Sequence, residues 1–327
     1  MNVLVTGGAG FLGGYIMAAL QRKGHEAFAY DIAAPSADTL AVSPDIASRF
    51  RSGQINDIAR LFAVCRSDRI EAIIHSAGMV GLEPSLEQPI ATYQTNIMGL
   101  VNVCEVARQL SMRRVVFVSS NAAYHKGSGA TLVETDPAFS IRDANPAGHY
   151  GTSKMAGEAI GLAYADFQNL DFLAIRITAI YGFGMRSPMY IKPMVENSVA
   201  GRPTRFATGG RMKRDYTHVL DCSDGIVTAL TAPPWKAGEQ RVINVASGNA
   251  RTASEVARIV RDTIPGADIE IGDDLTPLEE QNVKMRTSLD IAAARRLLNW
   301  SPQWPLEKGI SEYAETFQRH LSRCSTS

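Results

Sequence analysis

The sequence predicts an α/β fold in which helices cover both faces of a parallel sheet, with a smaller C-terminal α+β lobe. Short, nearly continuous apolar strands alternate with helical patterns through the first half of the chain, which is typical of a doubly wound sheet. A glycine-rich turn directly follows the first strand and opens the first helix. With 327 residues, 45% of them hydrophobic, the chain is long enough for one large domain or two of ordinary size.

Apolar runs and helical spacing place the elements in order. The first strand ends at Thr6, and Gly24 ends the first helix. Up to Thr178 the pattern predicts strands at 2–6, 26–31, 71–77, 113–120 and 171–178, and helices at 11–23, 89–110 and 150–167. Beyond Thr178 the pattern loosens, and it predicts helices at 193–201, 221–232, 253–264, 289–298 and 306–321 with strands at 241–246 and 268–271.

Composition excludes several classes of protein. Lys plus Arg and Asp plus Glu both number 33, and this balance argues against a nucleic-acid-binding protein, which needs surplus cations. No apolar run approaches the roughly 20 residues of a membrane helix. The chain opens as a strand rather than a signal peptide, and its four Cys and six His residues show no metal-binding spacing. We therefore expect a cytoplasmic protein that binds no membrane, nucleic acid or metal.

Gly7, Gly10 and Gly13 form a Gly-x-x-Gly-x-x-Gly turn between the first strand and the first helix. Glycines let the backbone approach a pyrophosphate, and the helix N-terminus presents free N–H groups and the positive end of its dipole. An acidic residue about 20 residues further on is expected to hold the adenosine ribose. Asp31 lies 18 residues after Gly13, and no Arg or Lys stands beside it to receive a 2′-phosphate. The turn therefore predicts NAD rather than NADP.

Tyr150 and Lys154 are four residues apart, which places a phenol and an ammonium on one face of the predicted helix. A free phenol has a pKa of about 10 and is a poor base at neutral pH. A neighbouring ammonium and an oxidised nicotinamide both favour the phenolate, so the pair suits removal of a proton from an alcohol. Ser119 and Ser120 end a strand at the sheet edge where ligands bind, and can supply a hydroxyl to the substrate oxygen.

Further motifs follow in a recognisable order. They are His75-Ser76-Ala77-Gly78, Asn96-Ile97-Met98-Gly99, Val118-Ser119-Ser120-Asn121-Ala122-Ala123-Tyr124, Arg176 leading to Tyr181-Gly182, Arg214-Asp215-Tyr216-Thr217-His218-Val219, Asn244-Val245-Ala246-Ser247-Gly248 and Arg295-Arg296-Leu297-Leu298-Asn299-Trp300-Ser301-Pro302. With the glycine turn and the Tyr-x-x-x-Lys pair, they make the chain resemble the extended short-chain dehydrogenase/reductase superfamily, in its NAD-dependent epimerase/dehydratase branch. We accordingly expect residues 1–178 to form an NAD-binding Rossmann domain, with segments near 214–247 returning to it, and residues 179–327 to form mainly a substrate-binding lobe.

The resemblance implies roles for individual residues. Tyr150 would be the catalytic acid/base, Lys154 its partner and Ser120 the catalytic hydroxyl, whereas Asn96 is either a position near the site or a satisfied core amide. The implied cofactor-binding set is Gly7, Gly10, Phe11, Leu12, Gly13, Asp31, Gln54, Ile55, Ser76, Ala77, Gly78, Asn96, Val118, Ser119, Tyr150, Lys154 and Ile177. The implied substrate-binding set is Met79, Ser120, Asn121, Tyr150, Ala179, Arg186 and Arg214. The family pairs the helices at 89–110 and 150–167 of two chains, which implies a homodimer.

Some residues depart from the family pattern. Gln54 stands where the family has an Asp that reaches the adenine, and its amide oxygen can make that contact. UDP-sugar epimerases hold the diphosphate with an Asn and an Arg, whereas this chain has Ala179 and Glu280 at the matching positions. Arg286 would replace the Arg if the alignment shifts. A carboxylate at the second position would repel a diphosphate, which favours a smaller anionic or polyol substrate.

These observations predict NAD-dependent hydride transfer at a secondary alcohol carbon of a sugar, sugar acid or hydroxy acid, with net dehydrogenation as the outcome. The alternative is a nucleotide-sugar 4-epimerase of the UDP-hexose type, which would keep NAD tightly bound and release no NADH. A third possibility, of another class, is an NAD-binding scaffold without turnover, although such relatives usually lose the Tyr or the Lys. Dehydration is disfavoured because Ser120-Asn121-Ala122 replaces the Thr-Asp-Glu run of sugar-nucleotide dehydratases.

Overall fold

A seven-stranded parallel sheet forms the centre of the molecule. The computed structural model describes residues 1–125, 131–236, 238–277, 279–280 and 287–324. The sheet has the order β12-β7-β5-β4-β1-β2-β3. Its strands are β1 (Asn2–Thr6), β2 (Glu26–Asp31), β3 (Phe50–Ser52), β4 (Ala72–His75), β5 (Arg114–Ser120), β7 (Phe172–Ile177) and β12 (Val242–Val245). The strand order reverses between β1 and β4, and ligands of such sheets bind at the carboxyl ends of the strands beside this point.

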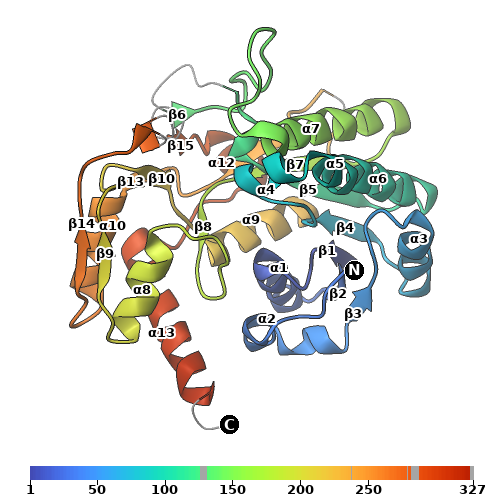
Figure 1. Cartoon of the computed structure of the whole chain (residues 1–327). Coiled ribbons are helices and arrows are strands. Elements are labelled where there is room, and N and C mark those ends of the chain that lie inside the picture. The colour runs from blue at the N-terminus through green and yellow to red at the C-terminus, as the bar shows by residue number, and fades with distance from the viewer. Residues whose placement is uncertain (126–130, 237, 278, 281–286, 325–327) are drawn as a thin grey trace.

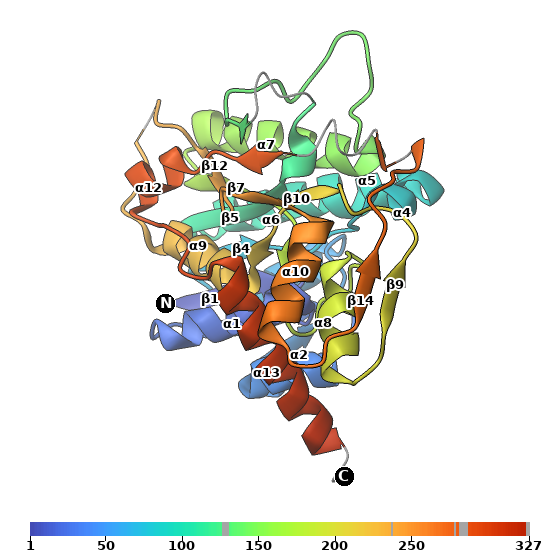
Figure 2. The same ribbon diagram turned by 90° about the vertical axis from the view of Figure 1, so that its left-hand side faces the viewer.

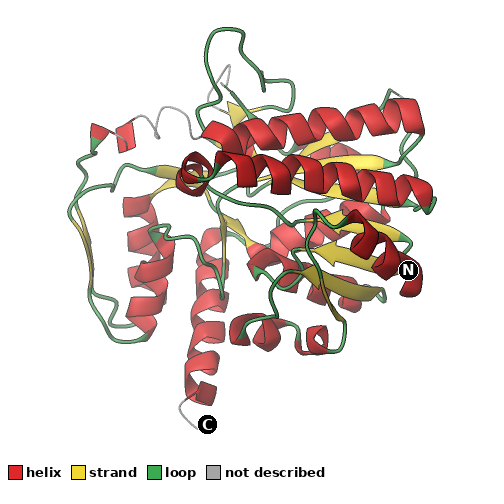
Figure 3. Cartoon of the chain, turned by 45° about the vertical axis from the view of Figure 1, so that its right-hand side comes forward, coloured by secondary structure: helices red, strands yellow, loops and turns green. Residues whose placement is uncertain are grey.

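Helices cover both faces of the sheet, which confirms the predicted fold class (Figures 1 and 3). One face packs against α1 (Phe11–Arg22), α9 (Val219–Thr231) and α12 (Ala292–Leu298). The other face packs against α3 (Ile58–Ser67), α6 (Gly99–Gln109) and α7 (Gly148–Gln168). The strands are buried on both sides, which explains why their sequences are almost continuously apolar.

The helical stretch predicted at 89–110 contains an irregularity. It consists of α5 (Pro89–Tyr93), a π-helical turn η2 (Gln94–Met98) and α6, which follow one another without a break. Such wide turns are rare and often occur at functional sites. Asn96 lies in this turn and is buried.

A second lobe packs beside the sheet (Figure 2). It contains α8 (Ile191–Val199), α10 (Ala253–Thr263) and α13 (Leu306–Cys324), which share one apolar core. Two-stranded sheets join β9 (Thr204–Phe206) to β14 (Ile269–Ile271) and β10 (Lys213–Asp215) to β13 (Ala250–Thr252). Between these segments the chain returns to the main sheet as α9, β12 and α12.

Several short elements were not predicted. The helix expected at 289–298 begins only at Ala292, because Ser288–Leu289 forms β15 and pairs with β6 (Thr131–Leu132). Three helices were also not predicted, namely α2 (Ala37–Val42), α3 and α4 (Leu82–Glu87). The fold is completed by the turns η1 (Pro44–Ala47) and η3 (Asn121–Ala123), and by the paired strands β8 (Ile180–Tyr181) and β11 (Thr217–His218).

A buried arginine ties the start of β5 to the end of α9. The Arg114 side chain is 1% exposed and bonds the Asp171 carboxylate at 2.6 Å. Its guanidinium also donates to the carbonyl oxygens of Ala229, Leu230, Ala232 and Pro233. These are orphan acceptors at a helix C-terminus, where a cation is favoured.

Arg114→Met is therefore expected to lower the free energy of unfolding by about 3 kcal/mol, because the partly buried Asp171 carboxylate and several buried carbonyl groups lose the Arg114 donor. Urea denaturation followed by circular dichroism measures this loss. The matched control is Arg113→Met, which changes the exposed neighbouring arginine and should stay within about 0.5 kcal/mol of the wild type. Equal effects of the two substitutions would contradict this role of Arg114.

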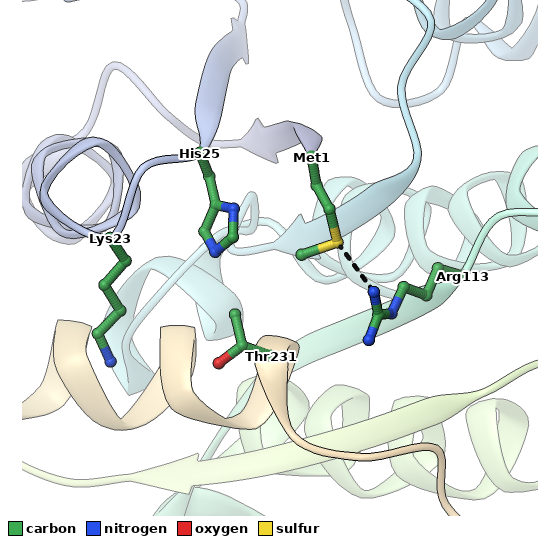
Figure 4. Close-up of a pocket in the computed structure, with 5 residues that line it drawn as sticks. All are labelled: Met1, Lys23, His25, Arg113 and Thr231. Atoms are coloured by element: carbon green, nitrogen blue, oxygen red, sulfur yellow. Dashed lines mark hydrogen bonds between the residues drawn. The ribbon is translucent and has the colours of Figure 1, made fainter.

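A cavity of about 380 Å³ opens at the amino-terminal edge of the sheet (Figure 4). It is lined by Met1, Lys23, His25, Arg113 and Thr231. Lys23 is already paired with Asp224 at 2.8 Å, and the Arg113 guanidinium donates to the Met1 sulfur at 3.7 Å. This cavity lies at the opposite edge from the glycine turn and from the carboxyl ends of the strands.

Candidate active site

The turn after β1 leaves no room for a side chain at Gly7 or Gly13. Gly7 has a φ of +69°, and a Cβ there would lie 2.8 Å from the Ala77 amide nitrogen. A Cβ at Gly13 would collide with the Gly7 carbonyl oxygen. Gly10 is the N-cap of α1 and provides no side-chain cap, so N–H groups of the first helical turn remain available. A bare backbone at a helix N-terminus fits the pyrophosphate of a dinucleotide.

Asp31 lies beside this turn at the end of β2. Its carboxylate accepts hydrogen bonds from the backbone N–H groups of Ala9, at 3.2 Å, and Ile32, at 2.8 Å. These contacts aim a partly exposed carboxylate at the space above the glycine turn. Gln54 is exposed beyond β3, and its carbonyl oxygen accepts from the Tyr30 hydroxyl. The pyrophosphate and ribose contacts expected for NAD thus have suitable residues.

The position of Asp31 supports a prediction about cofactor choice. The wild-type protein is expected to bind NAD at least about a hundredfold more tightly than NADP, because the carboxylate repels a 2′-phosphate. Asp31→Asn should weaken NAD binding and narrow this preference by about tenfold or more. Isothermal titration calorimetry with both cofactors measures the two affinities. Asp45→Asn, in the turn η1, is the control. If the two variants showed the same preference for NAD over NADP, ribose binding by Asp31 would be wrong.

Lys154 is buried under the carboxyl end of β5. It is 4% exposed, and its ammonium donates to the Val118 carbonyl oxygen at 2.7 Å. The ammonium nitrogen lies 4.7 Å from the centre of the Phe117 ring and 5.9 Å from that of Tyr150. Burial lowers the pKa of Lys154 to about 8, against the opposing effect of the Glu158 carboxylate. Lys154 therefore stays mostly protonated at neutral pH.

Tyr150 stands one helical turn before Lys154 on α7, next to Ser120. Burial raises the pKa of the Tyr150 phenol, and hydrogen bonding with Ser120 acts to lower it. The Ser120 hydroxyl also accepts from the Ala122 N–H at 3.1 Å and donates to the Asn121 side-chain oxygen at 3.3 Å. The structure thus brings together Ser120, Tyr150 and Lys154, as well as Asn121 from the predicted substrate set.

The loop after β4 lies between the glycine turn and α7. Ala77 lies against Gly7, and a Cβ at Gly78 would lie 4.0 Å from the Lys154 nitrogen. Asn96 holds this loop, since it accepts from the Met79 N–H at 2.8 Å and donates to the Met79 carbonyl oxygen at 2.9 Å. Its second amide hydrogen goes to the Ser153 hydroxyl. Both donors of Asn96 are therefore used by the protein, and Asn96 also lies against Gly78 beside Lys154, so it is a satisfied amide near the candidate site.

Other predicted cofactor residues fall into two groups. One group lies at the carboxyl edge of the sheet. It consists of Phe11 and Leu12 in the first turn of α1, Ser76 after β4, and Val118 and Ile177 at the ends of β5 and β7. Ile55 is buried and packs against Gly99. The Ser119 hydroxyl turns into the core and donates to Glu158 at 2.5 Å.

The predicted substrate residues of the second lobe are less concentrated. Arg214 is partly buried, and burial lowers its pKa. Among the described residues, no carboxylate forms an ion pair with it. Arg186 is exposed on the loop before α8, and no contact brings its side chain to Arg214 within the described part of the chain. Ala179 has a φ of +36°, a left-handed conformation that Asn tolerates better than Ala. Arg286 lies outside the described residues.

Two absences apply to the described part of the chain. No group of three or more His, Cys, Asp or Glu residues there is arranged to hold a metal ion. None of its helices combines the length and the apolar character that crossing a bilayer requires.

Comparison with known proteins defines the class of protein. Residues 3–246 match the model of the NAD-dependent epimerase/dehydratase family. The chain therefore belongs to this family of enzymes, and NAD is the cofactor of the family. The expected superfamily and cofactor are confirmed.

Individual relatives match along almost their whole length. The chain is 28% identical to a UDP-glucose 4-epimerase of Mycolicibacterium smegmatis, covering 97% of this chain and 99% of that protein. It is 25% identical to a probable UDP-glucuronate 4-epimerase of Rhizobium meliloti, covering 100% and 99%. The crystal structure of a Thermotoga maritima UDP-glucose 4-epimerase with UDP-glucose superposes with a TM-score of 0.83 at 22% identity, covering 98% of this chain and 100% of that chain.

Proposed function

We propose that the protein is an NAD-dependent 4-epimerase of a UDP-linked sugar. The observation that carries this proposal is the assembly of Tyr150, Ser120 and Lys154 beside the glycine turn, in a chain that matches UDP-sugar 4-epimerases from end to end. The net dehydrogenation favoured by the sequence receives less support, because the relatives described above are named epimerases, and epimerisation involves no net oxidation of the sugar.

The catalytic residues would act on the oxygen of a secondary alcohol. Ser120 hydrogen-bonds this oxygen while Tyr150 takes its proton as general base, which contributes about 10²- to 10⁴-fold to the rate in enzymes of many kinds. The Lys154 ammonium stabilises the developing phenolate. NAD, when bound, supplies the acceptor for the hydrogen that leaves the carbon and a positive charge that further favours the phenolate. Inversion requires the ketone to turn within the site before Tyr150 returns the proton to its oxygen.

Arg214 supports an anionic substrate. A partly buried guanidinium without a carboxylate partner among the described residues is free to bind phosphate or carboxylate oxygens. Glu280, the carboxylate expected to repel a diphosphate, is exposed. Water and salt screen exposed charges, so this carboxylate opposes a diphosphate only weakly.

A second candidate is the net dehydrogenation of a smaller sugar acid or hydroxy acid. Ala179 favours it, because this residue supplies no polar group where UDP-sugar epimerases place an Asn. Glu279 adds a carboxylate that is partly buried beside the second lobe, where it accepts from the Tyr190 hydroxyl at 2.6 Å.

Parallel assays distinguish the two candidates. The purified protein is incubated with NAD and UDP-glucose, UDP-glucuronate, free aldoses, sugar acids or hydroxy acids, while NADH absorbance and sugar isomers are followed. An epimerase converts a UDP-sugar to its 4-epimer without accumulating NADH. Accumulation of NADH with a free acid or sugar, and no isomer change in any UDP-sugar, would replace the proposal with the second candidate.

We also propose a homodimer formed through α5, η2, α6 and α7. Large apolar side chains are exposed on these elements, namely Ile90 (73%), Met98 (50%) and Phe167 (80%). Sedimentation should give twice the mass of the 35.4 kDa chain, and Ile90→Asp with Met98→Asp should give a monomer. Ile141→Asp, on the exposed loop between β6 and α7, is the control. A wild-type monomer at micromolar concentration would rule out the dimer.

A further inference from the structure

An ion pair lies in the core behind the catalytic helix. Glu158 on α7 and Arg176 on β7 are only 5% and 4% exposed. The Arg176 guanidinium donates from Nε to Oε1 of Glu158 at 2.9 Å and from Nη2 to Oε2 at 2.6 Å. This two-point geometry is strong, yet burial of two charges often gives little net stability. A role for the pair beyond stability is therefore worth seeking.

The pair is connected to the catalytic residues through β5. Lys154 and Glu158 lie one turn apart on α7, and they bond consecutive residues of β5. Lys154 donates to the Val118 carbonyl oxygen at 2.7 Å, and Glu158 accepts from the Ser119 hydroxyl at 2.5 Å. Ser120, the next residue along the strand, is the one that reaches Tyr150. These two bonds set the position of Ser120 relative to α7.

The charges around Lys154 come from several elements. On α7 they are the Tyr150 phenol and the Glu158 carboxylate, which is the group that raises the pKa of Lys154. From β4, His75 faces Lys154, and burial and the Lys154 charge lower its pKa to about 3, so it is neutral. From β7, Arg176 bonds the far side of Glu158 and offsets part of its charge. Of these groups, the Glu158 carboxylate is the one that favours the charged form of Lys154, and it acts without a direct hydrogen bond to the ammonium, which donates to Val118.

We propose that Glu158 is a positioning residue of the active site, which keeps Lys154 protonated and fixes the end of β5 against α7 while Arg176 moderates its charge. This inference rests on the proposed roles of Tyr150 and Lys154 in proton transfer. The proposed role predicts opposite effects on the pKa of Lys154 for two substitutions that each remove one charge of the pair. Glu158→Gln removes the anion and should lower the pKa of Lys154, whereas Arg176→Gln leaves the anion uncompensated and should raise it.

The test measures Lys154 directly, in the full chain without cofactor. Lysine ε-carbons labelled with ¹³C are titrated by NMR, and the Lys154 signal is assigned by its loss in Lys154→Met. We expect the pKa of Lys154 to fall by about one pH unit in Glu158→Gln and to rise in Arg176→Gln. The double variant should titrate close to the wild type. Because no turnover is needed, a wrong substrate or reaction would leave this result unchanged.

The pH profile of kcat/KM provides the functional readout. Its alkaline limb should move to lower pH in Glu158→Gln and to higher pH in Arg176→Gln, whereas a merely structural pair would lower activity equally at all pH values. The proposal would be overturned if the Glu158→Gln variant folds and the pKa of its Lys154 equals the wild-type value. If Glu158→Gln does not fold, the Arg176→Gln variant provides the test. A pKa of Lys154 at or below the wild-type value in that variant would overturn the proposal.

Discussion

Tyr150→Phe should lose about a thousandfold in kcat while it binds NAD with nearly unchanged affinity. The substitution removes one hydroxyl and keeps the ring beside Lys154, so the proposed general base is lost while the packing is kept. Turnover of the proposed UDP-sugar substrate is measured by isomer analysis, and NAD affinity by calorimetry. Thermal unfolding of the variant should match the wild type.

Tyr164→Phe is the matched control, because Tyr164 lies on the same helix, fourteen residues beyond Tyr150, and is partly buried. It should retain full activity. A Tyr150→Phe variant with wild-type turnover would contradict the assigned acid/base and leave only a scaffold role for the NAD site.

Lys154→Met should reduce kcat by about a hundredfold or more and weaken NAD binding. Burial already raises the pKa of the Tyr150 phenol, and loss of the neighbouring ammonium raises this pKa further. The residual activity should therefore increase toward high pH, where more phenolate forms. Wild-type activity should instead fall above about pH 8, as Lys154 loses its proton.

Lys192→Met is the control for this prediction, because Lys192 lies on α8 and pairs with Glu196 at 2.6 Å in the second lobe. Its pH profile should equal that of the wild type. If Lys154→Met kept the wild-type pH profile with only a uniform loss of rate, the electrostatic role of Lys154 would be wrong.

Local patterns predicted the parts of the fold and site that depend on neighbouring residues. The glycine turn and the Tyr150–Lys154 pair each lie within one short segment, and most strands of the sheet are nearly continuously apolar because both faces are covered. Helix α3 was not predicted, although Leu61, Val64 and Cys65 form a buried apolar face along it.

Contacts between distant segments could not be predicted in the same way. The Ser119 hydroxyl turns toward Glu158, which is 39 residues away in the chain, and Asn96 bonds Met79 from a π-helical turn. The only local signal for Glu158 is its place one turn after Lys154, a spacing that by itself indicates a surface ion pair. The positions of Arg186 and Arg214 depend on how loops of the second lobe fold, which hydrophobic periodicity does not determine.

In the proposed reaction, the hydrogen removed from a secondary alcohol carbon returns to the same sugar. The most direct test supplies UDP-glucose deuterated at C4 and follows the label by NMR and mass spectrometry. The account predicts that the deuterium is retained at C4 of the inverted product, with no labelled NADH in solution. Recovery of the deuterium in free NADH, together with an oxidised sugar, would contradict the proposed epimerisation. So would a sugar whose label and C4 configuration are both unchanged.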